Sequence, residues 1–214
     1  MNSLRVSTSV AFVAYAASAV MTFSACSSDQ TTPSASMSAG SASAPSVTEA
    51  VTPPSAAPAA VDSTCPTAAP GNGATPEWTL TGATGSVAVT GSTDTTAPRV
   101  NVTAPFSVTQ TEVHTLRAGD GPVVEPTATV SVCYMGVDGR DGSVFDSAYQ
   151  RGTPAQFSLD AVVPGFQKAI GGQKVGSTVA VAMASADGYP DGQPNAGIQK
   201  GDTLVFAIKI LSVP

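Results

Sequence analysis

The chain has 214 residues and a net charge of −6, and only 11% of its residues are charged. This acidic balance leaves no basic patch for a phosphate backbone, so we expect no nucleic-acid partner. With three cysteines, one histidine and no Cys-x-x-Cys pair, the sequence offers no typical metal site, and we expect neither a metal nor another cofactor.

Residues 1–25 have the pattern of a signal peptide. Arg5 supplies a positive charge before an apolar run, 10–23, that is too short to span a membrane comfortably. Two small residues stand directly before Cys26, an ending that resembles the lipobox of bacterial lipoproteins. We therefore expect an exported lipoprotein of the actinobacterial type, held at the outer face of the bacterial cell membrane by a lipid on Cys26. The alternative is an ordinary signal peptide with an incidental cysteine.

Residues 26–61 consist almost wholly of serine, alanine, threonine and proline. Such a composition buries too little apolar surface to offset the chain entropy lost on folding, so we expect a disordered linker behind the lipid anchor. Its prolines favour extended conformations that hold the following segment away from the membrane surface.

Residues 62–112 contain Trp78 and two short alternating pieces, 87–89 and 100–102, separated by glycine, threonine and proline. This pattern predicts one to three short strands. They are too few for an independent core, so we expect a β-containing extension that packs on the next domain.

Residues 113–214 contain three cleanly alternating runs, 129–135, 178–184 and 203–211, each with one apolar face. Nothing long and helical separates them, which favours an antiparallel sheet. In 164–172 a proline at the start, two glycines at the end and an apolar pair four residues apart predict one short helix. The expected fold class is α+β, with an antiparallel sheet wrapped on one short helix.

Several segments of this domain resemble FKBP-type peptidyl-prolyl cis-trans isomerases. They are, in family order, 132–136 (VCYMG), 142–147 (GSVFDS), 157–159 (FSL), 162–166 (VVPGF), 175–177 (VGS), 187–189 (DGY) and 201–206 (GDTLVF). The resemblance covers about Val113 to Pro214 and implies an FKBP-like fold.

The resemblance also implies site residues and an activity. The matching positions of the apolar proline pocket are Tyr134, Phe145, Phe157, Val162, Val163, Phe166, Ile198 and Phe206, and the matching polar positions are Asp146 and Tyr189. The implied substrates are proline-containing polypeptides, and macrolides of the FK506 and rapamycin type are implied ligands. We expect a monomer that assists the folding of exported or cell-envelope proteins.

The family reaction needs no nucleophile, in agreement with a sequence that offers no credible Ser-His-Asp or Cys-His set. An X-Pro bond rotates against a barrier of about 18–20 kcal/mol set by amide resonance. Twisting reduces the charge separation of the amide, so a dry apolar pocket disfavours the planar ground state more than the twisted one.

Other interpretations remain open. The aromatic residues could form a core instead of a pocket, as in a purely structural surface domain. A binding module without turnover is also possible, because Phe166 stands where many members have tryptophan, Ala155 where an aromatic is frequent, and Ala207 where an acidic residue is common. Cys65 and Cys133 either form a disulfide that attaches the extension to the domain or remain separate thiols.

Overall fold

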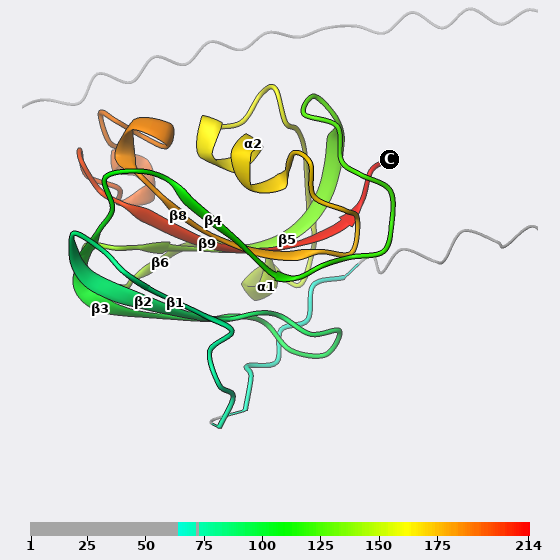
Figure 1. Cartoon of the computed structure of the whole chain (residues 1–214), viewed down its shortest axis with the longest axis horizontal. Coiled ribbons are helices and arrows are strands. Elements are labelled where there is room, and N and C mark those ends of the chain that lie inside the picture. Colours follow the sequence, from blue (N-terminus) through cyan, green and yellow to red (C-terminus); the bar gives the residue numbers. More distant parts are fainter. Residues whose placement is uncertain (1–63, 72) are drawn as a thin grey trace, which may run out of the picture. The chain divides into compact units, whose positions relative to one another are not determined.

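The computed structural model describes residues 64–71 and 73–214. The signal peptide predicted for 1–25, the lipidation predicted at Cys26 and the linker predicted for 26–61 lie outside the described residues. Within those residues, no helix is long and apolar enough to cross a membrane. Figure 1 shows a large sheet with a short helix over one face and a smaller sheet over the other.

The large sheet has six strands, and all of its pairings are antiparallel. They are β4 (Glu112–Arg117), β5 (Thr129–Asp138), β6 (Val144–Ser147), β7 (Ala155–Ser158), β8 (Thr178–Met183) and β9 (Leu204–Ser212). Their order is β4-β8-β9-β5-β6, and β7 pairs with the first half of β5. The antiparallel sheet and the strands predicted at 129–135, 178–184 and 203–211 are therefore confirmed.

The concave face of this sheet carries the main core. In β8 and β9 every second residue points to this face, where the aliphatic side chains are fully buried. The buried strand residues of this layer are Val130, Val132, Val179, Val181, Met183, Leu204, Phe206, Ile208 and Ile210.

The helix α2 (Pro164–Ile170) covers the concave face (Figure 1). Pro164 occupies the first turn, where its missing N–H costs no hydrogen bond. Phe166 and Ile170 lie on the buried side of α2. Gly165 lets the helix approach the sheet, because a Cβ atom there would lie 2.5 Å from Cγ of Met183. One further helical turn, α1 (Ala148–Arg151), and two 3₁₀ turns, η1 (Ser185–Asp187) and η2 (Pro194–Ala196), complete the helical segments of the described residues.

The smaller sheet is an antiparallel meander of β1 (Trp78–Thr81), β2 (Thr84–Thr90) and β3 (Arg99–Ser107). It packs on the outer face of β8 and β9, where the side chains that meet it are small. This second buried layer consists of Val87, Val89, Phe106, Ala180, Ala182, Val205 and Ala207. Three alanines let the two sheets approach closely, and the apolar layer therefore crosses the boundary that the sequence places at Val113.

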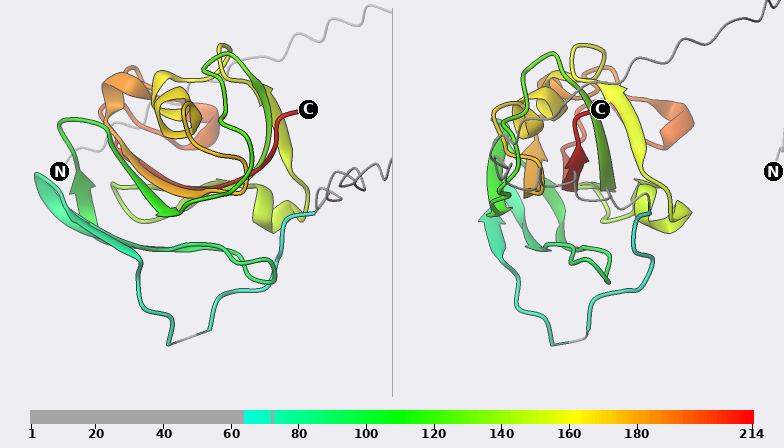
Figure 2. Two further views of the ribbon diagram at one scale, coloured as in Figure 1. Left: turned by 45° about the vertical axis from the view of Figure 1, so that its right-hand side comes forward. Right: turned by 90° about the vertical axis from the view of Figure 1, so that its right-hand side faces the viewer.

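A disulfide joins Cys65 to Cys133 of β5, with 5.7 Å between their Cα atoms. The N–H of Cys65 also donates to the carbonyl of Gly152, just after α1, at 3.1 Å. Figure 2 shows the segment that starts at residue 64 passing beside α1. Both sulfur-bearing residues are buried together with Tyr149, whose hydroxyl bonds to that of Ser92 at 2.8 Å. Of the two alternatives that the sequence leaves open for these cysteines, the structure contains the disulfide.

Candidate active site

A cavity of about 410 Å³ opens on the concave face of the large sheet. Its walls come from β5, β6, β7, β9, α2 and the segments before α2 and after η1. The lining residues are Tyr134, Phe145, Asp146, Phe157, Ala161, Val162, Val163, Phe166, Tyr189 and Phe206. The fold thus brings residues that are far apart in the sequence together on one mainly aromatic surface.

Phe166 lies at the centre of the aromatic wall. Its ring stands edge-to-face against Phe206 at 4.7 Å, Phe157 at 5.5 Å and Tyr134 at 5.9 Å between ring centroids. Edge-to-face packing places the positive rim of one ring against the negative face of another, which fixes the rings without filling the space between them. The phenyl ring of Phe166 therefore contacts three of the other rings that line the cavity.

Gly136 of β5 allows two rings to meet above the strand. A Cβ atom at this residue would lie 2.7 Å from the rings of Phe145 and Phe206, closer than two carbon atoms can approach. These two rings stand edge-to-face at 5.6 Å between centroids. In the Tyr-x-Gly sequence of β5, Tyr134 is thus a wall residue, and the glycine leaves the space that the rings of Phe145 and Phe206 occupy.

The polar side of the cavity is a connected group of three side chains. The hydroxyl of Tyr134 donates to one oxygen of Asp146, and the guanidinium of Arg151 in α1 donates to the other. The same guanidinium donates to the Tyr134 hydroxyl at 3.3 Å, and its central carbon lies 5.8 Å from the centroid of the Tyr134 ring. Arg151 therefore fixes both polar groups of this wall.

These contacts shift the pKa values of Asp146 and Tyr134. Burial opposes the charge on Asp146, but hydrogen bonds from Tyr134 and Arg151 outweigh it and hold the pKa of this carboxyl below its ordinary value. Burial and the neighbouring carboxylate raise the pKa of Tyr134. The wall therefore carries a neutral phenol bonded to a carboxylate at neutral pH, an arrangement that orders dipoles and offers no free base.

The turn before α2 supplies backbone groups at the cavity edge. The carbonyl of Val163 accepts the N–H of Phe166 at 2.9 Å, which starts the helix. Among residues 64–71 and 73–214, no backbone hydrogen bond uses the N–H of Val163. This N–H is one of the donors that a helix start leaves free.

Nine of the ten residues that the resemblance assigns to the site line this cavity. The exception is Ile198, which is only 2% exposed and belongs to the main core. Its segment is Pro- and Gly-rich, and the backbone of Ile198 pairs with that of Gln193.

Two residues of the site have no counterpart in the sequence-based assignment. Ala161 lines the cavity but carries no chemistry that would mark it. Arg151 follows Asp146 by five residues, and only the turn of α1 between them brings the two charges together. The sequence offers only a weak signal for this ion pair. An acidic residue stands just before the N-cap of a short helix, and a basic residue stands at the end of that helix.

The two alanines noted in the sequence do not change the cavity. Ala207 points to the outer face of β9, where it packs with Val87 and Val89 of the smaller sheet. Ala155 pairs with Val132 in the ladder between β7 and β5 and is not a lining residue. Both departures therefore concern the surroundings of the site.

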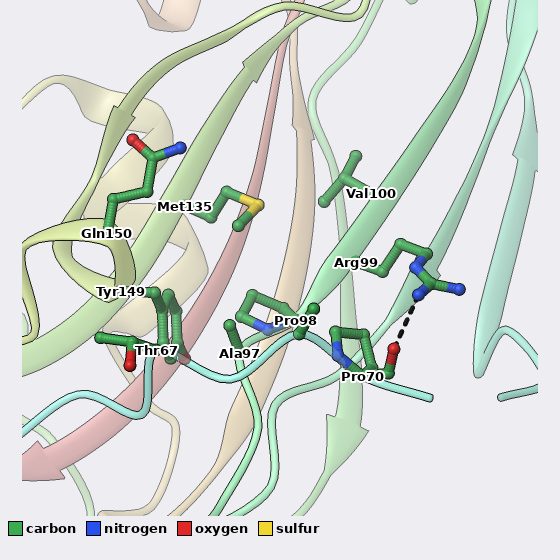
Figure 3. A pocket seen from close by; sticks show the side chains of 10 residues that line it. Thr67, Pro70, Ala97, Pro98, Arg99, Val100, Met135, Tyr149 and Gln150 are labelled. Atoms are coloured by element: carbon green, nitrogen blue, oxygen red, sulfur yellow. Dashed lines mark hydrogen bonds between the residues drawn. The ribbon is translucent and has the colours of Figure 1, made fainter. Parts of the chain in front are cut away.

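A second cavity, of about 270 Å³, lies between the 64–71 segment, the start of β3 and α1 (Figure 3). Met135 lines it from β5, and Tyr149 and Gln150 line it from α1. One edge is closed by Arg99, whose guanidinium donates to the carbonyl of Pro70 at 2.7 Å. Within the part of the chain that the structure describes, no cluster of histidine, cysteine or acidic residues is arranged to hold a metal.

A sequence profile of the FKBP-type peptidyl-prolyl cis-trans isomerases matches residues 121–211. The chain is 39% identical over 98 residues to an FK506-binding protein of Streptomyces anulatus, a match that covers 44% of this chain and 79% of that protein. It is 35% identical over 96 residues to a probable FKBP-type peptidyl-prolyl cis-trans isomerase of Haemophilus influenzae, covering 45% of this chain but only 39% of that protein.

Among solved structures, a peptidyl-prolyl cis-trans isomerase from Pseudomonas syringae pv. tomato is similar to this chain. The two share 28% identity with a TM-score of 0.43, and the match covers 48% of this chain and 74% of that one.

Proposed function

The chain belongs to the family of FKBP-type peptidyl-prolyl cis-trans isomerases, and from this premise we propose that it isomerises X-Pro bonds of polypeptides in the cavity between β5, β9 and α2. One observation carries the proposal: the rings of Tyr134, Phe166 and Phe206 stand around an open cavity and do not fill it. Aromatic residues that served only as a core would close this space, because protein interiors are packed without voids of this size.

The cavity suits a prolyl ring in size and in chemistry. Its volume of about 410 Å³ lies in the range of small-molecule sites, and six of its ten lining residues are aromatic. A proline bound against Phe166 and Phe206 loses its water, and the carbonyl before it loses solvent that stabilises the planar amide. Because the twisted amide has less charge separation, the dry wall lowers its relative free energy.

The polar groups orient the substrate. We assign one substrate carbonyl to the N–H of Val163 and another to the hydroxyl of Tyr189, because both residues line the cavity. Asp146 orders the wall through Tyr134 and Arg151, and we assign it no proton transfer. Rotation then occurs about one bond of a peptide that is fixed on both sides.

The test is a refolding reaction limited by proline isomerisation, catalysed by the full chain in detergent. We expect the wild-type chain to accelerate it and Phe206→Ala and Tyr134→Ala to lose most of the acceleration. Val144→Ala is the matched control, because Val144 neighbours Phe145 but is 41% exposed. A folded wild-type chain that gives no acceleration contradicts the proposal. Binding of a rapamycin-type macrolide by such an inactive chain would support a non-catalytic binding module.

The observation that remains for a binding module is Phe166 in place of tryptophan. Ala155 and Ala207, the other two departures, lie outside the cavity lining. Because Phe166 contacts three other rings of the cavity, we rank catalysis first.

We also propose that the protein acts outside the cytoplasm as a lipid-anchored monomer that assists the folding of exported or cell-envelope proteins. The support is the signal pattern before Cys26 and the disulfide, since disulfides persist mainly in oxidising compartments. Mass spectrometry of the N-terminal peptide from a bacterial membrane fraction tests this placement. We expect a diacylated Cys26, and release of Cys26→Ala from the membrane fraction. An unmodified cysteine would contradict it.

A further inference from the structure

We propose that Asp187 is a positioning residue of this site, which holds Tyr189 at the cavity rim by tying η1 to α2 and to the segment before β4. The inference rests on the proposed isomerase function. It concerns a side chain outside the cavity lining, so its role is indirect.

Asp187 accepts two hydrogen bonds on the same oxygen. Nζ of Lys168 lies 2.7 Å from Oδ2 of Asp187, and Oγ1 of Thr111 lies 2.5 Å from it. These two donors hold the pKa of Asp187 below its ordinary value, and the carboxylate is charged at neutral pH. The contact is therefore an ion pair that a neutral hydroxyl reinforces.

The three partners come from three separate parts of the fold. Lys168 follows Phe166, the cavity floor, by two residues in α2, and Asp187 precedes Tyr189, the cavity rim, by two residues. The ion pair therefore links the floor to the rim on the outside of the cavity.

Thr111 extends this link to the start of the large sheet. Its Oγ1 accepts the N–H of Ala184 at 3.1 Å while it donates to Asp187. Ala184 directly precedes η1 and Asp187 is its last residue, so one hydroxyl contacts both ends of this turn. Thr111 thereby helps to fix the position of the rim, although it precedes the part of the chain that resembles the family.

The ring of Tyr189 packs against the main core, but most hydrogen bonds of the rim segment are internal to it. No side chain caps η1, and Gly188 follows it at once. Tyr189 is itself held through its carbonyl, which accepts the N–H of Gly192 at 2.9 Å and the hydroxyl of Ser185 at 3.5 Å. These hydrogen bonds lie within the rim segment, and among the described residues the one side-chain hydrogen bond between this segment and α2 is that of Lys168 with Asp187.

The ion pair is well suited to positioning because it contributes little to global stability. The side chain of Lys168 is 55% exposed and that of Asp187 is 22% exposed. Ion pairs with a partner in solvent have small effects on unfolding. Loss of the pair should therefore move Tyr189 without unfolding the chain.

The experiment is a double-mutant cycle between Asp187→Asn and Tyr189→Phe in the full chain, with a chromogenic proline tetrapeptide as the substrate. We expect Asp187→Asn to lower kcat/KM by about 10-fold, because a displaced substrate donor binds the reacting peptide in the wrong geometry. In the Tyr189→Phe background the same substitution should have no further effect, since the hydroxyl that it positions is already absent.

Asp191→Asn is the matched control. Asp191 lies two residues after Tyr189 and is also paired with a lysine, Lys200, at 3.4 Å, but both side chains are more than three-quarters exposed. We expect its kcat/KM to equal that of the wild type. Thr111→Val and Lys168→Met each remove one hydrogen-bond partner of Asp187. If Asp187→Asn fails to fold, these variants replace it, and each is expected to lose part of the wild-type kcat/KM.

The possible failures are distinguishable. A folded wild-type chain without isomerase activity overturns the proposed function and with it the role of Asp187. An active wild type that Asp187→Asn leaves unchanged overturns the positioning role alone. Equal losses in both backgrounds, or losses that follow a falling melting temperature, show a structural residue that does not act through Tyr189.

Discussion

Cys133 bonds to Cys65 and directly precedes Tyr134, which lines the cavity. The disulfide and the cavity therefore lie on opposite faces of strand β5. Side chains alternate along a strand, which places the sulfur on the outer face and the phenol on the inner one. The disulfide therefore attaches the start of the extension behind the wall of the site without entering the site.

Removal of this disulfide should lower stability and spare activity. For Cys65→Ser/Cys133→Ser we expect the free energy of unfolding to fall by about 2–4 kcal/mol, because the bond closes a loop of 68 residues in the unfolded chain. Urea denaturation monitored by the fluorescence of Trp78 measures it. The value of kcat/KM under native conditions should stay within about two-fold of wild type. An unchanged denaturation midpoint would contradict this account.

Ala207 should not tolerate the acidic residue that is common at this position. Its side chain is fully buried between the two sheets, and a carboxylate there would have no partner. We expect Ala207→Asp to destabilise the chain by about 3 kcal/mol or more. The control is Ala155→Asp, at a half-buried residue outside this layer, with an expected cost below about 1 kcal/mol. Thermal melting of both variants decides, and equal melting temperatures would count against a closed second layer.

The sequence predicts most of the sheet because its apolar residues alternate. Val179, Val181 and Met183 mark one face of β8, and the same rule applies to β9. It does not predict β4, since Glu112–Arg117 is an edge strand that is exposed along nearly its whole length and has no apolar face. An edge strand is defined by the backbone that it pairs with, which sequence periodicity does not record.

The site was predictable as far as the family resemblance extends. Tyr134, Phe145 and Phe206 are fixed by strand positions, and these positions carry over to this chain. Ile198 lies in a Pro- and Gly-rich segment whose conformation depends on local turns. The resemblance assigns it to the cavity, but in the structure its side chain belongs to the main core. The sequence does not predict the role of Arg151, because only the folded turn of α1 brings Arg151 next to Asp146.

Asp146 should make stability depend on pH at the acidic end. Its folded-state pKa lies below the ordinary value of 3.8 because hydrogen bonds from Tyr134 and Arg151 outweigh the effect of burial. A depressed carboxyl pKa contributes stability that is fully present above the unfolded-state pKa and is lost as pH falls through the folded-state pKa. The stability difference between wild type and Asp146→Asn should therefore be constant from about pH 7 to 5 and shrink below about pH 4.

Urea denaturation of both proteins across this range measures that difference. The control is Asp191→Asn, because this carboxylate is 90% exposed and should give a difference near zero throughout. A difference between wild type and Asp146→Asn that stays constant down to pH 3 would show that the carboxylate is not stabilised by Tyr134 and Arg151.

Residues 113–214 should not form a stable domain alone. Without β1, β2 and β3, the outer face of β8 and β9 would expose Ala180, Ala182, Val205 and Ala207, all of which are fully buried in the chain. Asp187 would also lose Thr111, and Cys133 would lose its disulfide partner. We expect the 113–214 fragment to aggregate or to melt far below the chain, because contiguous exposed apolar patches promote association.

A fragment of residues 64–214 keeps both sheets and the disulfide, and it is the matched comparison. We expect it to fold cooperatively with the melting temperature of the full chain, since it contains all three buried clusters. Circular dichroism and size-exclusion chromatography of the two fragments provide the measurement. If 113–214 were monomeric and as stable as 64–214, the layer between the sheets would contribute nothing to folding, and the extension would be an appendage to an independent domain.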